Sequence, residues 1–416
     1  MNPKLRNYRR EEVLSFARDI IKQYTPETQP LGFWLFDIQS VENAVARWKK
    51  AMPSVRPCFA VKCNPEPHLV KLLGELGCGF DCATINEIKE VVKLGFNVQD
   101  IIFSQTVKPY DQLIESFKMG VMHSTVDSVD EIQKIAKYAP GMGVVIRVME
   151  NDPTAGYTLG DKFGIYIDEA TEMIEEIKKH NLRLDGVHFH VGSGFQEEDV
   201  FRRALRKTKE IVDIAHKYGL KPYLFDLGGG FTQEGPFEKY GQVIEETIKE
   251  LKFPEGSHFI GEPGRYMATY AWHLVSSIHG RRIRHRKENE VVEYTVGDGI
   301  HGNFGNITLF GERRYCESAT SDEKEKVFKS VVYGCTCDGS DIISEVELPM
   351  MESGKDWIIF PNNGAYTMSL CTNFNGFVNR NMKIYMLPSA NRQTIEIDKE
   401  IEEKSIPALN SYEKIN

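Results

Sequence analysis

Residues 57–95 decide the fold, and they read PCFAVKCNPEPHLVKLLGELGCGFDCATINEIKEVVKLG. Two short apolar runs, 57–62 and 78–83, alternate with two longer segments, 66–76 and 85–95, that have a helical apolar period. Short apolar runs predict buried strands, and recurrence of apolar residues every three to four positions predicts helices. The stretch therefore predicts two consecutive βα units.

The same alternation continues to about residue 265. Further strand candidates occupy residues 100–104, 121–126, 143–149, 184–190, 223–228 and 258–263. Further helix candidates occupy residues 128–138, 169–180, 201–219 and 240–251. The strands are nearly continuous apolar runs, as expected where both faces of a sheet are buried. Eight such units predict an α/β fold, a TIM-like (β/α)8 barrel, with an open doubly wound sheet as the alternative.

After about residue 270 the pattern changes. Segments such as EVVEYTVGDG and WIIFPNNGAY predict strands that are separated by charged or glycine-containing turns, without long helices. One further strand candidate, FWLFDI, precedes the barrel at 33–38. We therefore expect a barrel domain over residues 37–270 and a second, all-β domain built from residues 1–36 and 271–416.

The overall composition excludes some classes of protein. A net charge of −9 and a pI near 5.8 argue against a dedicated nucleic-acid binder. The amino terminus lacks a signal peptide pattern, and no apolar run is long enough to cross a bilayer. We expect a cytoplasmic protein without a membrane partner, in which the eight cysteines are free thiols. Four cysteines lie between residues 58 and 82, but their spacing matches no common zinc pattern, so no metal site is expected.

Reactive residues stand at the predicted carboxyl ends of the strands, where barrel enzymes place their active sites. They are Lys62, Asp81, Arg147, His190, Gly228, Gly229, Gly230, Glu262 and, close behind, Arg265. Each alone has a structural explanation: Lys62 could be a surface lysine, and the glycines could form a tight turn. Their occurrence on one rim indicates a functional site.

The residue types on this rim suit a phosphate-bearing pyridine cofactor. Lys62 follows the apolar run FAV and is expected to be part-buried, which favours Schiff-base chemistry. The triple glycine lets backbone amides approach a phosphate, to which Ser193 and Arg265 could add donors. Glu262 lies in an apolar strand and needs a partner. A protonated pyridine nitrogen is one suitable partner, and an internal arginine is the alternative.

Several motifs carry a resemblance to a known family. In chain order they are AVKCNP, FDCAT, KFG, HFHVGSG, DLGGGF, GEPGRY, CDGSD and GAYT. This ordered set, from about residue 30 to about residue 385, resembles the ornithine/arginine/diaminopimelate decarboxylase family, which has an alanine-racemase-like barrel. The resemblance implies pyridoxal 5'-phosphate (PLP) as cofactor.

The resemblance also implies roles for residues in the cofactor site. Lys62 would bind the cofactor as a Schiff base, His190 would stack on its ring, and Glu262 would pair with the ring nitrogen. The phosphate would be held by Ser193, Gly228, Gly229, Gly230, Arg265 and Tyr366. Supporting positions around Lys62 would be taken by Asp81, Glu87 and Arg147.

For the substrate, the resemblance assigns Cys337 as the acid that protonates the α-carbon, although Cys335 is a competing assignment. Asp338 would bind the distal amine. In this family the residues at these two positions come from the second subunit, so a homodimer with shared active sites is expected. Phe374 is a further expected substrate contact.

The segment 300–315 departs from the family pattern. His301 stands where a tyrosine is expected, and Phe310 falls where Tyr-Asp is expected. The second aspartate that would share the distal amine is therefore missing, although the neighbouring Glu312 could replace it. Loss of one of two carboxylates from such a site could weaken binding by roughly 2–5 kcal/mol.

The leading expectation from the resemblance is decarboxylation of the basic amino acid L-ornithine to putrescine and CO2, the first step of polyamine biosynthesis. Decarboxylation of lysine or arginine is the alternative within the same chemistry. A third possibility is a weakly active or inactive paralogue that binds an antizyme-like regulator, as antizyme inhibitors do. The retained Lys62, Glu262 and Cys337 argue against this third possibility, while the substitution at Phe310 keeps it open.

Overall fold

The structure is a computed structural model that describes residues 8–158, 162–197, 199–286, 289–311, 313–321, 326–377 and 381–397. These residues form two compact units. The first unit contains residues 43–267, and the second contains the described residues up to 42 and from 268 to 395.

The first unit is built on a closed barrel of parallel strands. The strands are β2 (Val55–Ala60), β3 (Gly79–Cys82), β4 (Ile101–Phe103), β5 (His123–Val126), β6 (Gly143–Val148), β7 (Leu184–Phe189), β8 (Leu224–Asp226) and β9 (His258–Gly261). The barrel closes where β9 pairs with β2, with Phe259 opposite Val55. The predicted TIM-like barrel is confirmed, and the doubly wound alternative is excluded.

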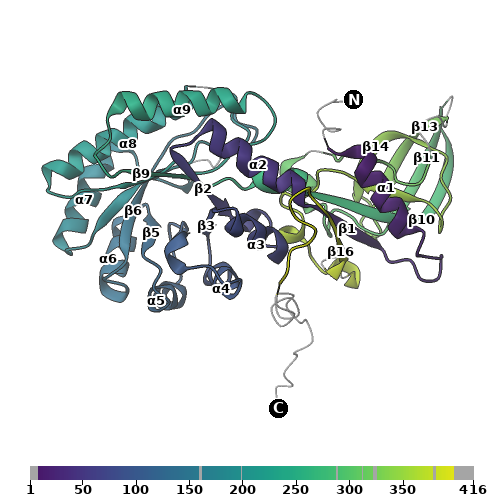
Figure 1. Cartoon of the computed structure of the whole chain (residues 1–416), viewed down its shortest axis with the longest axis horizontal. Coiled ribbons are helices and arrows are strands. Elements are labelled where there is room, and N and C mark those ends of the chain that lie inside the picture. Colours follow the sequence, from purple (N-terminus) through teal and green to yellow (C-terminus); the bar gives the residue numbers. More distant parts are fainter. Residues whose placement is uncertain are drawn as a thin grey trace, which may run out of the picture. The chain divides into compact units, whose positions relative to one another are not determined.

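Helices surround the barrel, as Figure 1 shows. They are α2 (Ile38–Ala51), α3 (Pro67–Glu75), α4 (Ile85–Lys93), α5 (Tyr110–Lys118), α6 (Val129–Tyr138), α7 (Ala170–Lys179), α8 (Val200–Lys217) and α9 (Phe237–Leu251). Each presents an apolar stripe to the strands; α8, for example, buries Leu205, Ile211 and Val212. Strands β6 and β7 are buried along their whole length, which explains their continuous apolar sequences.

The second unit is built on a mixed sheet, in which β1 (Gly32–Asp37) pairs with a strand from the far end of the chain. The other strands are β10 (Trp272–Arg286), β11 (Asn289–Val296), β12 (Glu317–Ser318), β13 (Val327–Tyr333), β14 (Ile342–Pro349), β15 (Trp357–Phe360) and β16 (Lys383–Leu387). The predicted second β domain, with strands from both ends of the chain, is confirmed.

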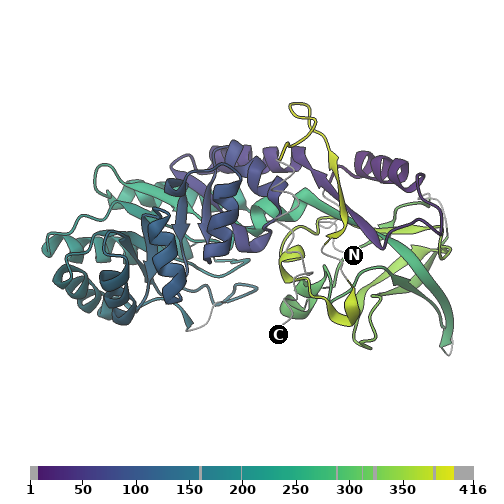
Figure 2. The ribbon, with the colours of Figure 1, turned by 90° about the horizontal axis from the view of Figure 1, so that it is seen from below.

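This unit also contains helices that the strand pattern did not indicate. Helix α1 (Arg10–Ile21) packs its apolar face, including Leu14, against Phe33 and Trp357 of the sheet. In Figure 2 it is the purple helix that lies beside the sheet. A short helix, α11 (Gly305–Phe310), lies within the segment that departs from the family pattern.

None of the helices in the described ranges has the length and apolar character needed to cross a membrane.

Candidate active site

Lys62 lies on a short turn just beyond β2. The strand ends at Ala60, whose N–H donates to the carbonyl of Pro263 (3.3 Å), and the turn η2 (Val61–Cys63) follows. Nζ of Lys62 forms an ion pair with the buried carboxylate of Asp81 on β3. The Lys62 side chain is 42% exposed, more than the sequence indicated.

Two carboxyl groups lie near this lysine: Asp81, which is buried, and Glu87, which is half-buried. Asp81 is fully buried and accepts a hydrogen bond from the hydroxyl of Ser104 as well as the Lys62 contact. Burial and the nearby charge of Glu262 raise the pKa of Asp81 to about 6. Glu87 is placed by the start of α4, where it accepts a hydrogen bond from the N–H of Ala83 (2.6 Å), and burial raises its pKa. Lys62 therefore lies close to two acidic side chains whose pKa values are raised.

The glycine segment 228–230 forms a tight cradle after β8. Gly228 and Gly230 have positive φ angles, 64° and 90°, which favour glycine. A Cβ on Gly230 would lie 1.8 Å from the carbonyl oxygen of Gly192, so the segment packs directly on the HVGSG loop that carries Ser193. The two glycine-rich loops therefore meet without intervening side chains, and such close packing of backbone suits an anion site. Arg265 begins the short helix α10 (Arg265–Ala268), just beyond Glu262.

His190 and Arg147 lie near the ends of neighbouring strands. The N–H of Gly192 donates to Nδ1 of His190 (3.0 Å), which places the proton of the neutral ring on Nε2. Burial lowers the pKa of His190 to about 3, so a neutral aromatic ring faces the site at neutral pH. Arg147 lies with its guanidinium 4.7 Å from the centre of the Phe163 ring, and burial lowers its pKa.

Glu262, which follows β9, is 3% exposed. Its N–H donates to the carbonyl of Gly228 (2.6 Å), which ties it to the glycine cradle. Its Oε1 is buried and has no hydrogen-bond partner among the described residues. An unpartnered buried carboxylate oxygen is costly unless a ligand supplies a donor. A protonated pyridine nitrogen supplies one, so this oxygen and the glycine cradle together fit pyridoxal phosphate.

Comparison with known proteins agrees with this geometry. Residues 38–269 match the family described as "Pyridoxal-dependent decarboxylase, pyridoxal binding domain". The chain belongs to this family. It is a pyridoxal-dependent decarboxylase, a lyase whose cofactor is pyridoxal phosphate.

Individual relatives match this decarboxylase along most of its length. The solved structure of ornithine decarboxylase from Entamoeba histolytica is 52% identical, with a TM-score of 0.78, and the match covers 91% of this chain and 99% of that one. The arginine decarboxylase of Paramecium bursaria Chlorella virus, bound to agmatine, is 33% identical with a TM-score of 0.84 (90% and 100% covered). Ornithine decarboxylase 2 of Drosophila melanogaster is 35% identical over 370 residues (86% and 93% covered).

Two residues at the decarboxylase site were missed from the sequence. His188 lies two residues before His190, and Asp226 closely precedes the glycine segment. Both are buried beside Glu262. Residues two apart on a strand share a face, so His188 could have been found from the position of His190.

The predicted reader of the distal amine, Asp338, lies in the second unit beside His301. Nε2 of His301 lies 2.7 Å from Oδ2 of Asp338, and the N–H and hydroxyl of Ser340 donate to Oδ1 (2.8 and 2.7 Å). These hydrogen bonds, His301 first, lower the pKa of Asp338 to about 2. The His301 ring lies 4.3 Å, centre to centre, from the ring of Phe374, which is 44% exposed. The structure thus brings Asp338, His301 and Phe374 together.

The other predicted residues of the second unit are also near this group or near each other. Cys337 is exposed, and its N–H donates to Oδ1 of Asn375 (2.9 Å), whereas Cys335 is half-buried. The Phe310 ring lies 5.7 Å from that of Tyr366. Glu312 lies outside the described residues.

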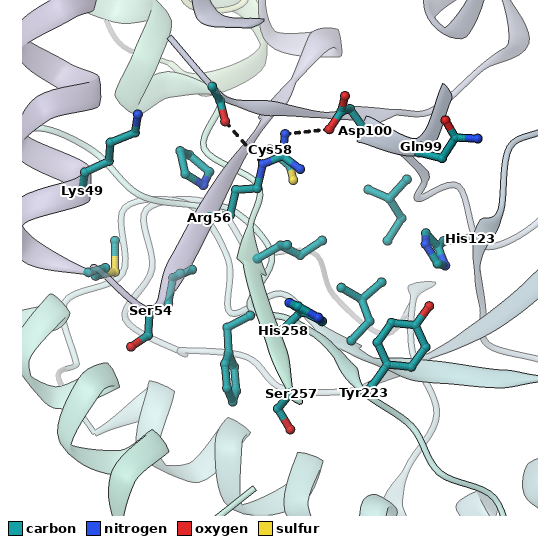
Figure 3. A pocket seen from close by; sticks show the side chains of 18 of the residues that line it. Lys49, Ser54, Arg56, Cys58, Gln99, Asp100, His123, Tyr223, Ser257 and His258 are labelled. Carbon is teal, nitrogen blue, oxygen red and sulfur yellow. Dashed lines mark hydrogen bonds and ion pairs between the residues drawn. The ribbon is translucent and has the colours of Figure 1, made fainter. Parts of the chain in front are cut away.

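A separate cavity of about 650 Å³ opens at the amino ends of the barrel strands. Figure 3 shows the polar residues that line it. They include Lys49, Arg56, Asp100, His123, Tyr223 and His258. Most stand at or just before the first residues of strands, whereas the Lys62 group stands after the last residues. This cavity could suggest a binding site, but the buried carboxyl groups Asp81, Asp226 and Glu262 are at the other end of the barrel.

Proposed function

We propose that this decarboxylase converts L-ornithine to putrescine and CO2, the first step of polyamine biosynthesis. The observation that carries the proposal is the carboxylate of Asp338, which contacts with His301 and Ser340 orient and which carries the negative charge that a distal ammonium group requires. The likeness to the Entamoeba histolytica ornithine decarboxylase over nearly the whole chain supports it.

The barrel residues suit the cofactor chemistry. Gly228–Gly230, Ser193 and Arg265 would hold the phosphate group together with Tyr366, and Nζ of Lys62 would hold the cofactor covalently. Bound pyridoxal phosphate supplies an electron sink for the pair of electrons that CO2 leaves behind. Glu262 would keep the ring nitrogen protonated, and the neutral ring of His190 would stack on the cofactor.

Proton movements are assigned to two further groups. Asp81, which contacts Nζ of Lys62, would hold the proton of that amine when substrate replaces it. The thiol of Cys337 would return a proton to the α-carbon after CO2 leaves. Cys337 is exposed on its own subunit, which suits a group that completes the site of a partner.

Substrate choice is tested by steady-state kinetics with ornithine, lysine and arginine. We expect the highest kcat/KM for ornithine. Asp338→Asn should raise KM for ornithine at least about tenfold, because one charge-assisted bond lost from a desolvated amine is worth more than about 1.4 kcal/mol. Equal or better turnover of arginine, the substrate class of the viral relative, would overturn the ornithine proposal.

We also propose a homodimer with shared active sites. Lys62→Ala and Cys337→Ala should each be inactive alone. Refolding or co-expressing them together should restore about a quarter of wild-type activity, because random pairing yields one intact site in half of the dimers. No recovery in mixed dimers that gel filtration shows to form would contradict the shared site.

We also propose a cytoplasmic location for this protein. All eight cysteines are free thiols, which a reducing compartment maintains. An interaction with an antizyme-like regulator stays a prediction, and titration of such a regulator into the purified enzyme, read out as loss of the dimer, would test it.

A further inference from the structure

One imidazole and two carboxyl groups form a buried cluster on three consecutive barrel strands. His188 belongs to β7, Asp226 ends β8, and Glu262 follows β9. Backbone pairing puts His188 opposite Asp226, and Asp226 opposite Ile260. The three side chains are 1%, 0% and 3% exposed. One ring nitrogen of His188 and one carboxylate oxygen from each acid all lie within 4.8 Å of one another.

His188 is buried without an ordinary hydrogen bond. Neither of its ring nitrogens has a hydrogen-bond partner among the described residues. Its Nε2 lies 3.4 Å from Oε2 of Glu262, slightly beyond the usual hydrogen-bond length. An unsatisfied buried imidazole costs about 1–3 kcal/mol. An apolar side chain would fill this space without that cost, so the histidine needs a reason other than packing.

The two oxygens of Glu262 have different surroundings. Oε2 faces His188, while Oε1 is buried and unpartnered in the described part of the chain. With Oε2 next to the imidazole, Oε1 is the oxygen that is left for a ligand. Imidazole–carboxylate pairs orient ligand groups in this way at other protein sites.

The cluster holds one negative charge. Burial raises the pKa of Asp226 well above its usual range, and the charge of Glu262 adds to the effect. Burial also opposes ionisation of Glu262, but His188 and Lys62 overcome it and hold its pKa below the usual range. Burial lowers the pKa of His188, so its ring is a neutral hydrogen-bond donor at neutral pH. The proton resides on Asp226 and the charge on Glu262.

Other titratable groups act on this cluster from the neighbouring strands. They are Lys62 and Asp81 from the ends of β2 and β3, Arg147 from β6, and His190 after β7. Without His188, the charge of Asp81 would favour protonation of Glu262, since like charges oppose each other at low dielectric.

We propose that His188 is a positioning residue for the cofactor: it fixes Oε2 of Glu262, keeps this carboxylate charged, and so directs Oε1 at the ring nitrogen of pyridoxal phosphate. Asp226 completes the arrangement as a neutral acid. Its Oδ1 accepts a hydrogen bond from the N–H of Gly228 (2.9 Å), which connects the cluster to the glycine cradle. The inference rests on the proposed place of Glu262 at the ring nitrogen, and not on which amino acid is decarboxylated.

The test measures the ring nitrogen directly, in the intact protein loaded with pyridoxal phosphate labelled with ¹⁵N in the ring. The ¹⁵N chemical shift distinguishes a protonated from an unprotonated pyridine nitrogen, and no substrate is present. In wild type the shift should stay that of the protonated form from about pH 6 to pH 9, because a charged buried partner raises the pKa of the group it binds. In His188→Leu the nitrogen should lose its proton within this range.

The kinetic constants kcat and KM should respond differently to the loss of His188, which a general packing defect would not produce. In His188→Leu, kcat should fall about 10- to 100-fold, as for residues that orient a reactive group, while KM stays within about twofold. His188→Gln retains an N–H that can reach Oε2, and it should restore both the wild-type ¹⁵N shift and most of kcat. If His188→Leu does not fold, His188→Asn, which is shorter and loses the contact, replaces it.

His273 on β10 offers a matched control. It is also fully buried, and its Nε2 also has no hydrogen-bond partner among the described residues. His273→Leu should lower thermal stability without changing the ¹⁵N shift.

The outcomes separate the two proposals. Full cofactor occupancy with a wild-type ¹⁵N shift in both His188→Leu and His188→Asn would overturn the role of His188. A wild-type nitrogen that is already unprotonated, or that does not respond to Glu262→Gln, would instead overturn the proposed place of Glu262.

Discussion

The two ends of the barrel differ in what they bury. The amino end has a cavity of about 650 Å³, and charged residues that line it are partly exposed, as in the pair of Arg56 with Asp100 (2.7 Å; 46% and 36% exposed). The carboxyl end buries Asp81, Asp226 and Glu262 almost completely. Buried ionisable groups with shifted pKa values are costly to keep, and they cluster where chemistry occurs. Buried charge therefore supports the proposal that the active site lies at the carboxyl end, away from this cavity.

The contrast between the two ends of the barrel is tested most strongly by replacing Lys62. Lys62→Ala should lower kcat/KM by at least about 10³-fold, because a covalent cofactor contact and a proton carrier are lost together. The visible absorbance band of lysine-bound pyridoxal phosphate should disappear. Lys49→Ala, at the amino-end cavity, is the matched lysine control and should retain both activity and band. A wild-type protein that shows no band after incubation with the cofactor would refute the role of Lys62.

A smaller effect is expected at Glu262. Glu262→Gln should lower kcat about 10²- to 10³-fold, because the neutral amide no longer stabilises a protonated ring nitrogen. Asp100→Asn is the matched carboxylate control at the amino end and should change kcat less than about twofold. If the two variants lose activity equally, the proposed division between the ends is wrong.

The amino end should show its importance in stability. Asp185 is 2% exposed and accepts hydrogen bonds from Arg183 and the ring of His123 (2.8 Å). Burial opposes its charge, but these bonds hold its pKa below the usual value. Its contribution to stability is therefore present above the unfolded-state pKa of about 3.9 and is lost as the pH falls through the lower folded-state pKa.

Asp185→Asn should reduce the free energy of unfolding by about 1–3 kcal/mol at neutral pH and change kcat less than about twofold. The difference from wild type should shrink in acid, as urea unfolding at several pH values would measure. Asp213→Asn, at an exposed pair with Lys209 on α8, should cost less than about 0.5 kcal/mol. A difference between Asp185→Asn and wild type that grows in acid would show that this carboxylate does not stabilise the folded state by its charge.

The smallest effect is expected at Tyr223, which is 40% exposed on the rim of the amino-end cavity. Tyr223→Phe should leave kcat/KM within about twofold and stability within about 0.5 kcal/mol. A tenfold loss of activity would show that the cavity communicates with the chemistry at the opposite end.

Much of this site could be predicted from the sequence, because its residues follow successive strands of the barrel. The residues Lys62, Asp81, His190 and Glu262 stand at the ends of apolar runs, and parallel strands bring such ends to one rim. The sequence could place His188 on the same strand face as His190, but its partners Asp226 and Glu262 come from other strands and are known only from the fold. The exposure of Lys62 was also misjudged, since a turn after a strand can direct a side chain in several ways.

The sequence alone determined the alternation of strands and helices, the second β unit and the set of reactive residues, because these depend on local period and residue type. Only the tertiary structure decided that His188, Asp226 and Glu262 are buried together, and that His301 pairs with Asp338. Such contacts join residues distant in the chain, and the pKa of each group depends on burial and charge that the fold creates. The barrel could thus be predicted from the sequence, whereas the contacts that govern protonation at its carboxyl end could be found only in the three-dimensional structure.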